Sequence, residues 1–173
     1  GGVSVKLPSL LLDKLAGIPY CSDHALGKIP TGEGTGAAQL SSPSCPDASK
    51  IGSVAVAAGA GQSPFWAKTG SAYLAGPYKG APLSLAVVTP ALAGPFDLGN
   101  VVVRVALHVD PETAQVTADS DPLPTMLAGI PLDLRAIQVK LDHQDFTLNP
   151  TSCAPSAVSA VLTSTGGATA NSG

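Results

Sequence analysis

The sequence predicts an all-β fold: an antiparallel β-sandwich of about 7–9 strands with a short helical N-terminal segment pinned by a disulfide. Two features of the composition favour this class. The chain is 45% hydrophobic but only 4% aromatic and 12% charged, whereas roughly a quarter of residues are charged in an average domain. Its 19 glycines and 16 prolines separate short runs of Val, Thr and Ala, which are residues typical of strands.

The domain organisation follows from a change of pattern near Cys45. A chain of 173 residues is long enough for one domain with a sizeable core. We expect residues 1–44 to form a strand, short helices and a loop that pack on the sandwich, and residues 45–173 to form the sandwich itself. The two parts are expected to make one structural unit.

The N-terminal part changes pattern several times. VSVKLP, at 3–8, alternates and predicts a strand, and PSLLLDKLAG, at 8–17, has helical spacing with Gly17 at its exit. CSDHALGK then offers Ser22 or Asp23 as the N-cap of one or two helical turns. The glycine-rich stretch 29–44 is interpreted as a loop.

The clearest strand is VVVRVALHVD at 101–110, where alternate residues from Val101 to Val109 point to one side. The turn DPET follows, and AQVTAD at 114–119 returns with a second alternating run. These two runs predict a hairpin with one buried and one wetter face.

Further strands are expected along the rest of the chain. In PLDLRAIQVKL, at 131–141, the apolar residues change phase, so a strand there needs a bulge or bend near Arg135–Ala136. The remaining strand candidates are 53–58, 70–75, 82–89 and 156–164.

The chain has three cysteines, at 21, 45 and 153. Cys21 and Cys45 flank the irregular loop, and a disulfide between them would pin the N-terminal part to the first strand of the sandwich. Such a crosslink stabilises a fold by roughly 3 to 4 kcal/mol. A Cys45–Cys153 pair with Cys21 free is the competing interpretation.

If Cys21 and Cys45 pair, Cys153 has three alternatives. It forms a disulfide with a cysteine beyond Gly173 in a longer parent protein, it bonds to another chain, or it is an inert buried thiol. The first agrees with the ends of the sequence, GGVSVKLP and TANSG, which predict a piece cut from a longer protein.

Carboxylates gather in the segment HVDPETAQVTADSDPLP. Clustered carboxylates at strand ends can hold Ca²⁺ in extracellular sandwiches, whereas Asp-Pro is also ordinary turn chemistry. No other cofactor is expected. The candidate calcium ligands are Asp110, Glu112, Asp119 and Asp121.

Two other kinds of site can be considered. Exposed aromatic side chains can stack on sugar rings, and Phe65, Trp66 and Tyr78 are the candidates, although filling of a core or interface is the alternative. Lys6 and Asn149, on early and late strands, are candidates for an intramolecular amide, against the alternative of a solvated Lys and a turn-forming Asn.

Several functional classes are disfavoured. The net charge of −3 and the absence of any Lys/Arg cluster argue against nucleic acid as a partner. No apolar run approaches the ~20 residues of a membrane-spanning helix, so no membrane insertion is expected. The three histidines, at 24, 108 and 143, belong to no catalytic motif, and we expect no enzymatic activity.

Four stretches together resemble a repeat module of very long secreted proteins of actinobacterial type: YCSD with SPSCPDASKIG, GPYKGAPLSLAVVTPALAGPFDLGNVVVR, SDPLPTMLAGIPLDLR and FTLNPTSCAP. The resemblance covers roughly residues 3–170. It implies secretion to a cell surface or extracellular setting, and a further cysteine downstream as the partner of Cys153. It implies no enzymatic activity and supplies no catalytic residues.

The expected function is therefore that of a non-enzymatic structural or adhesive module of a larger surface or filament-forming protein. Neighbouring modules or copies of the same chain are the expected partners, through strand edges that few charges guard. The alternative function is a carbohydrate-binding module for a polysaccharide, with calcium as an aid.

Overall fold

The computed structural model describes residues 4–7, 10–59, 65–124, 126–127, 130–131, 134–141, 159–164 and 168–172. Strands dominate these residues, and each strand pair is antiparallel. The predicted all-β class is confirmed. The strands are β1 (Ser4–Leu7), β2 (Lys50–Ala58), β3 (Phe65–Ala75), β4 (Leu83–Ala93), β5 (Phe96–Val109), β6 (Val116–Ser120), β7 (Met126–Leu127), β8 (Ile130–Pro131), β9 (Leu134–Leu141), β10 (Ser159–Ser164) and β11 (Ala168–Ser172).

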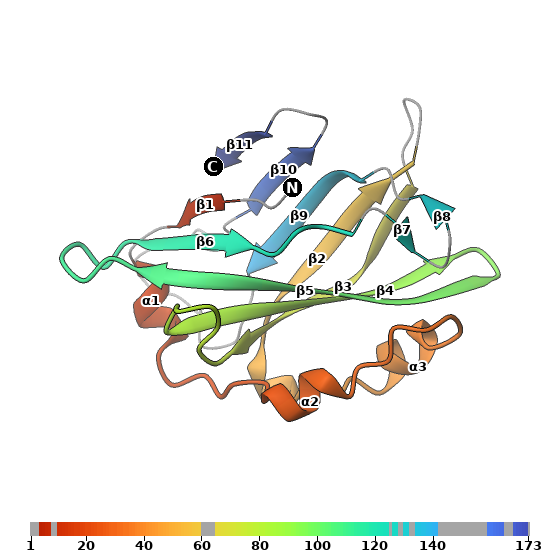
Figure 1. Ribbon diagram of the computed structural model, residues 1–173, viewed down its shortest axis with the longest axis horizontal. Coiled ribbons are helices and arrows are strands. Elements are labelled where there is room, and N and C mark those ends of the chain that lie inside the picture. Colours follow the sequence, from red (N-terminus) through yellow and green to blue (C-terminus); the bar gives the residue numbers. More distant parts are fainter. Residues whose placement is uncertain are drawn as a thin grey trace, which may run out of the picture.

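Nine of these strands form one sheet in the order β1-β6-β5-β4-β3-β2-β9-β10-β11, and β7 pairs with β8 separately (Figure 1). Strands β2 to β6 are neighbours in the order of the chain. The chain then crosses to the other side of β2 and adds β9, β10 and β11. The structure thus confirms an antiparallel all-β fold but does not confirm a division into two packed sheets.

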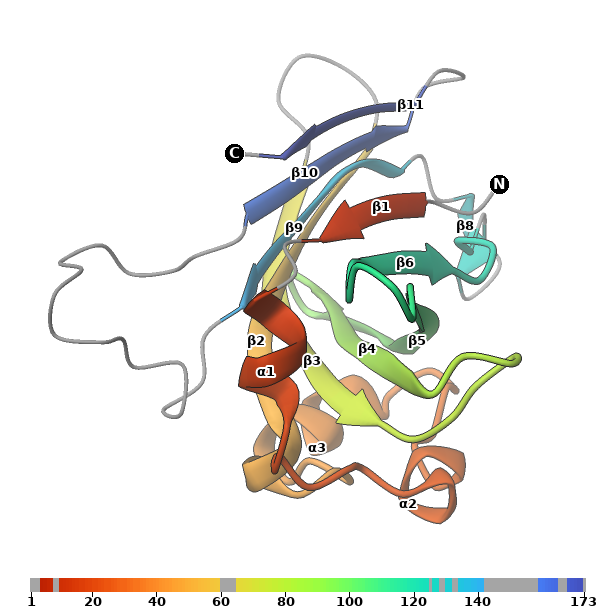
Figure 2. The ribbon, with the colours of Figure 1, turned by 90° about the vertical axis from the view of Figure 1, so that its left-hand side faces the viewer.

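The sheet is strongly curled, as Figure 2 shows when the molecule is viewed from the side. Leu7 of β1, Ala118 of β6 and Val139 of β9 all pack against the same buried cluster. Strands from opposite halves of the sheet therefore meet around one core. The buried members of this inner core are Leu15, Ile18, Ile51, Val54, Ala72, Leu74, Leu85, Leu107, Val116 and Leu141.

The alternation of the sequence explains which side chains face this core. Val105, Leu107 and Val109 of β5 lie in or against it, and Val116 of β6 joins them, as the predicted hairpin requires. Strand β5 begins at Phe96, five residues earlier than the apolar run suggested. The helix α1 (Leu10–Leu15) covers one end of the curl and contributes Leu15.

The predicted irregularity at Arg135–Ala136 is present as a register shift. Ala57 of β2 pairs with Ala136, but the next residue, Ala58, pairs with Leu134, so Arg135 is the extra residue of a bulge. The change of phase in the apolar pattern therefore predicted the bulge correctly, because side chains alternate strictly only where no residue is inserted into the strand.

The outer face of the sheet is covered by the segment that joins α1 to β2. This segment contains α2 (Asp23–Gly27), α3 (Gly36–Ser41) and the 3-10 helix η1 (Asp47–Ser49). The expectation of a loop over 29–44 was wrong at α3. The four residues Ala37 to Leu40 include good helix formers, but the glycines before them obscured the signal. Figure 1 shows α2 and α3 on the side of β3, β4 and β5 away from β9 and β10.

Candidate functional site

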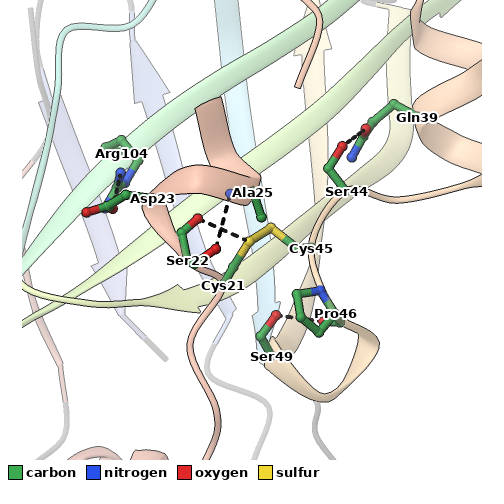
Figure 3. The surroundings of a disulfide bond; sticks show 10 residues. All are labelled: Cys21, Ser22, Asp23, Ala25, Gln39, Ser44, Cys45, Pro46, Ser49 and Arg104. Atoms are coloured by element: carbon green, nitrogen blue, oxygen red, sulfur yellow. Dashed lines mark hydrogen bonds and ion pairs between the residues drawn. A yellow bond between two sulfur atoms is a disulfide. The ribbon is translucent and has the colours of Figure 1, made fainter. Parts of the chain in front are cut away.

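The covering segment is joined to the outer face by a disulfide between Cys21 and Cys45, with a Cα–Cα distance of 5.2 Å (Figure 3). This is the pair that the spacing favoured. The backbone N–H of Cys21 also donates to the carbonyl of Leu74, at 2.7 Å, so the segment starts as a short bridge to the end of β3. Both sulfur atoms lie in a second buried cluster with Tyr73, Ala86 and other outer-face residues.

A carboxylate fixes the start of α3. Asp97 accepts hydrogen bonds from the backbone N–H groups of Ala37 at 2.9 Å, Gly36 at 2.8 Å and Gly99 at 3.0 Å. These three donors, Ala37 first, hold the pKa of Asp97 below its usual range. Gly99 has φ +97°, and a Cβ there would lie 2.6 Å from the carbonyl oxygen of Thr31. This close approach requires glycine.

The buried side chain of Asn100 holds the loop before α3. Its Nδ2 donates to the carbonyl oxygens of Pro30, at 2.8 Å, and Thr35, at 3.1 Å. Asn100 is thus a polar residue inside an apolar strand because it anchors backbone that lies across the outer face. Asp97 and Asn100 were not among the residues singled out from the sequence, although an Asn ahead of the run Val101–Val103 is the signal that could have revealed one of them.

A groove of about 360 Å³ lies on the outer face between the covering segment and strands β2, β3 and β4. Tyr73 lies at its floor and is almost fully buried, and burial raises the pKa of the Tyr73 hydroxyl. The residues that line the groove are Gln39, Leu40, Pro43, Cys45, Asp47, Lys50, Thr69, Ser71, Tyr73, Val88 and Pro90.

A second polar cluster surrounds Tyr78 in the PYKG turn. The guanidinium of Arg104 stacks 4.4 Å from the centre of the Tyr78 ring, and the Tyr78 hydroxyl donates to Asp121. Lys79 pairs with the same carboxylate at 2.6 Å. Lys79 and then Tyr78 lower the pKa of Asp121, while the hydrogen bond to Asp121 raises that of Tyr78.

Arg104 links this Tyr78 cluster to the cover. It donates to the hydroxyl of Ser84 at 2.9 Å, lies 3.8 Å from Asp23 at the start of α2, and is only 16% exposed. The hydroxyl of Ser84 in turn donates to the carbonyl of Gly76 at 2.7 Å. The charges and hydroxyls of the cluster therefore bind one another, which is the pattern of a structural network.

Three of the four predicted calcium ligands have separate partners, and the fourth, Glu112, contacts Asp110 through its backbone N–H. Asp110 accepts hydrogen bonds from the backbone N–H groups of Glu112 and Thr113 within its own turn. Asp119 lies 3.5 Å from His108. Asp121 belongs to the Tyr78 cluster. Among the residues that the structure describes, no three His, Cys, Asp or Glu side chains converge as metal ligands would.

The three predicted sugar-binding aromatics do not form one surface. Phe65 and Trp66 begin β3, whereas Tyr78 lies in the turn beyond the other end of that strand. About ten residues of extended chain separate them by roughly 30 Å. Tyr78 is instead held by Asp121 and Arg104.

The remaining candidates fall partly outside the described residues. Lys6 lies on β1, where it is exposed and pairs in register with Thr117. Asn149 and Cys153 both lie outside the described ranges. The predicted amide bond and the predicted partner of Cys153 therefore involve residues outside the described ranges.

The curled sheet has two edges, β1 and β11. Within the described ranges β11 pairs with β10 alone, and β1 pairs with β6 alone. β1 carries one exposed charge, Lys6. The sequence contains no charged residue and no histidine after Asp145, so β10 and β11 are built from Ser, Ala, Val, Leu, Thr and Asn.

Comparisons with family models, with curated proteins and with solved structures found no match for this chain. The helices that the structure describes are all too short to cross a membrane. The site must therefore be interpreted from its own geometry.

Proposed function

We propose that this chain is a non-enzymatic module of a larger extracellular protein and that it acts by strand-to-strand association with neighbouring modules or copies of itself. The single observation that supports this proposal best is the β11 edge. It is an edge strand five residues long that pairs on one side only among the described residues, and it has neither a charge nor a proline to deter a second strand.

The two edges differ in a way that favours β11 as the site of association. An inward- or outward-pointing Lys on an edge strand is a common means of preventing edge-to-edge contact, and β1 has Lys6 exposed. β11 and its neighbour β10 lack such a residue. Pairing of β11 with β11 of a second copy would close a dimer, whereas pairing of β11 with β1 would extend into a filament.

The proposed extracellular setting agrees with the disulfide. Crosslinks such as Cys21–Cys45 persist in oxidising compartments and are rare in the cytosol. The low content of charged residues, 12%, also means that solvent meets Ser, Thr, Ala and Gly over much of the surface. Such a surface suits a spacer or adhesive unit in a chain of modules.

Sedimentation equilibrium over a range of protein concentrations tests this proposal. We expect the unaltered chain to associate reversibly, because the unpaired backbone groups of β11 can join a ladder. The double variant Thr169→Lys with Asn171→Lys places two charges on alternate residues of β11, and it should remain monomeric at concentrations where the unaltered chain is at least half associated.

The matched control places the same two charges elsewhere. Thr31→Lys with Ser42→Lys alters two exposed positions of the covering segment, away from both edges, and changes the net charge of −3 by the same amount. It should associate like the unaltered chain. Equal weakening in both variants would assign the association to net charge, and a monomeric unaltered chain would remove the proposal.

A further inference from the structure

The outer-face groove has the dimensions of a small-molecule site. Its volume of about 360 Å³ falls within the range of about 300–1,000 Å³ that is usual for such sites. Its walls are fixed on both sides, because Cys45 of the disulfide lines it and the opposite wall is the sheet itself. The groove therefore belongs to the folded framework and needs no rearrangement to form.

Gln39 supplies an uncommitted donor in this groove. Its side chain is only 6% exposed, and its Oε1 accepts a hydrogen bond from Ser44 at 2.9 Å. Among the described residues the Nε2 group has no hydrogen-bond partner, and Figure 3 shows the contact to Ser44 ending on the oxygen. The fully buried side-chain atoms without a partner among the described residues are Asn100 Oδ1 and Arg104 Nε, so Gln39 Nε2 is reachable from the groove and can donate to an acceptor brought by a ligand.

The other polar groups of the groove include a donor, Lys50, and an acceptor, Asp47. Lys50 and Asp47 bring one positive and one negative charge, so the groove has no net charge of its own. Thr69 donates its proton to the carbonyl of Pro90 at 2.8 Å, which leaves its oxygen free to accept. The Tyr73 hydroxyl is neutral at ordinary pH, since a tyrosine ordinarily has a pKa of about 10 and burial raises the pKa of Tyr73 further.

Apolar side chains complete the lining. Leu40 is 45% exposed at the end of α3, and Pro43, Val88 and Pro90 lie around the same groove. These groups can pack against C–H surface. They cannot satisfy a phosphate or any other strongly charged ligand.

We propose that this groove binds a neutral saccharide of one or two rings. Each sugar hydroxyl can donate and accept, as the mixed polar lining requires, and the C–H faces of the rings suit Leu40 and the prolines. An extended peptide fits less well, because it needs free backbone groups. The floor of the groove is strand β3, which is paired on both sides with β2 and β4. This groove is separate from Phe65, Trp66 and Tyr78, and its function does not depend on association through β11.

Titration followed by ¹H–¹⁵N correlation spectra tests the proposal on the intact, disulfide-bonded chain. The probes are cellobiose, maltose, mannobiose, xylobiose and N,N′-diacetylchitobiose, with tri-alanine as the peptide probe. At least one disaccharide should give saturable shifts, with a Kd on the order of 1 mM. The shifts should be confined to α3, to residues 43–50, to positions 69–73 of β3 and to positions 88–90 of β4, which together line the groove.

Two variants locate the binding. Leu40→Ala should raise the Kd roughly fivefold, whereas Met126→Ala, which removes a similar side chain that is 58% exposed outside the groove, should leave it within about twofold. Gln39→Glu keeps an acceptor for Ser44 but replaces the Nε2 donor with an oxygen, and it should abolish the saturable shifts. Leu40→Ala keeps the test valid if Gln39→Glu does not fold.

Three results would overturn the proposal. One is the absence of saturable shifts with all five disaccharides. Another is binding that Leu40→Ala and Met126→Ala weaken equally, because the contact would then lie elsewhere. The third is tri-alanine shifting the groove residues while the sugars do not, which would make the groove a peptide site. None of these results affects the sedimentation of the β11 variants, so the two proposals are tested independently.

Discussion

At the scale of single residues, glycine at position 70 allows β3 to pass close to both of its neighbours. A Cβ at Gly70 would lie 2.8 Å from the Thr89 hydroxyl oxygen, 2.8 Å from the Val54 carbonyl oxygen and 2.9 Å from the Val54 Cβ. The register between β2 and β3 also shifts between Val54 and Val56. Where neighbouring backbones approach this closely beside a bulge, there is no room for a side chain.

We therefore expect Gly70→Ala to lower the free energy of unfolding by about 1–3 kcal/mol, as measured by urea unfolding. Gly76→Ala is the matched control, because the nearest atom to its Cβ would be Tyr20 Cδ2 at 3.7 Å, an ordinary contact. Its effect should stay within about 0.5 kcal/mol. Equal stabilities of the two variants would show that β3 has room at Gly70.

The Asp97 carboxylate should make stability depend on pH. Its pKa is lowered in the folded chain, so the stability it contributes is present above the unfolded pKa of about 3.9 and is lost as the pH falls through the lower folded value. Thermal unfolding of the unaltered chain should thus shift to lower temperature between about pH 5 and pH 2.

Asp97→Asn should unfold at a lower temperature than the unaltered chain at pH 7 and should depend less on pH in the acid range. Glu33→Gln, which removes an exposed carboxylate from the same covering segment, should keep the steep acid dependence. If Asp97→Asn keeps it too, other carboxylates such as Asp121 account for the acid unfolding.

At the scale of elements, the covering segment depends on its disulfide. The loop between Cys21 and Cys45 spans 24 residues, and closing a loop of this size stabilises a fold by about 3–4 kcal/mol. Cys21→Ser with Cys45→Ser should lose that amount in urea unfolding and should expose α2 and α3 to proteolysis.

Cys153→Ser is the control, because it removes a cysteine and leaves the Cys21–Cys45 disulfide intact. It should resist proteolysis within residues 21–45 as the unaltered chain does. Unchanged proteolysis of the double variant would show that Asp97 and Asn100 suffice to hold the covering segment on the sheet.

Elements with regular alternation could be predicted from the sequence, and elements with weak local signals could not. The run from Val101 to Val109 predicted most of β5, and the phase change predicted the bulge at Arg135. Helix α3 was not predicted from the local sequence, because its start is fixed by Asp97, some sixty positions away in the chain. The groove was not predicted for the same reason, since Gln39 and Thr69 come to line one groove only after folding.

At the scale of the whole molecule, the order of the strands could not be read from local pattern. The alternation of β6 and β9 says nothing about their lying on opposite sides of β2 to β5, because that order depends on the crossing between them. The sequence predicted an all-β sandwich; the structure confirms the all-β class, and its described residues form a curled nine-stranded sheet with β1 and β11 at the edges and a separate β7–β8 pair. These edges give the molecule two places where another strand can pair.

The association proposed for these edges predicts a particular change in the backbone. When a second strand joins β11, the N–H groups on its open side become hydrogen-bonded and should exchange with deuterium more slowly. The exposed turn between β5 and β6 takes no part in the sheet and serves as an internal reference.

Hydrogen exchange compared between dilute and associated protein is therefore the most direct test of the proposed function. We predict that those amides of residues 168–172 that point to the open side of β11 gain at least tenfold protection on association, while those of residues 110–115 do not change. Association without added protection at either β11 or β1 would contradict the account, because the copies would then be joined by some surface other than a strand edge.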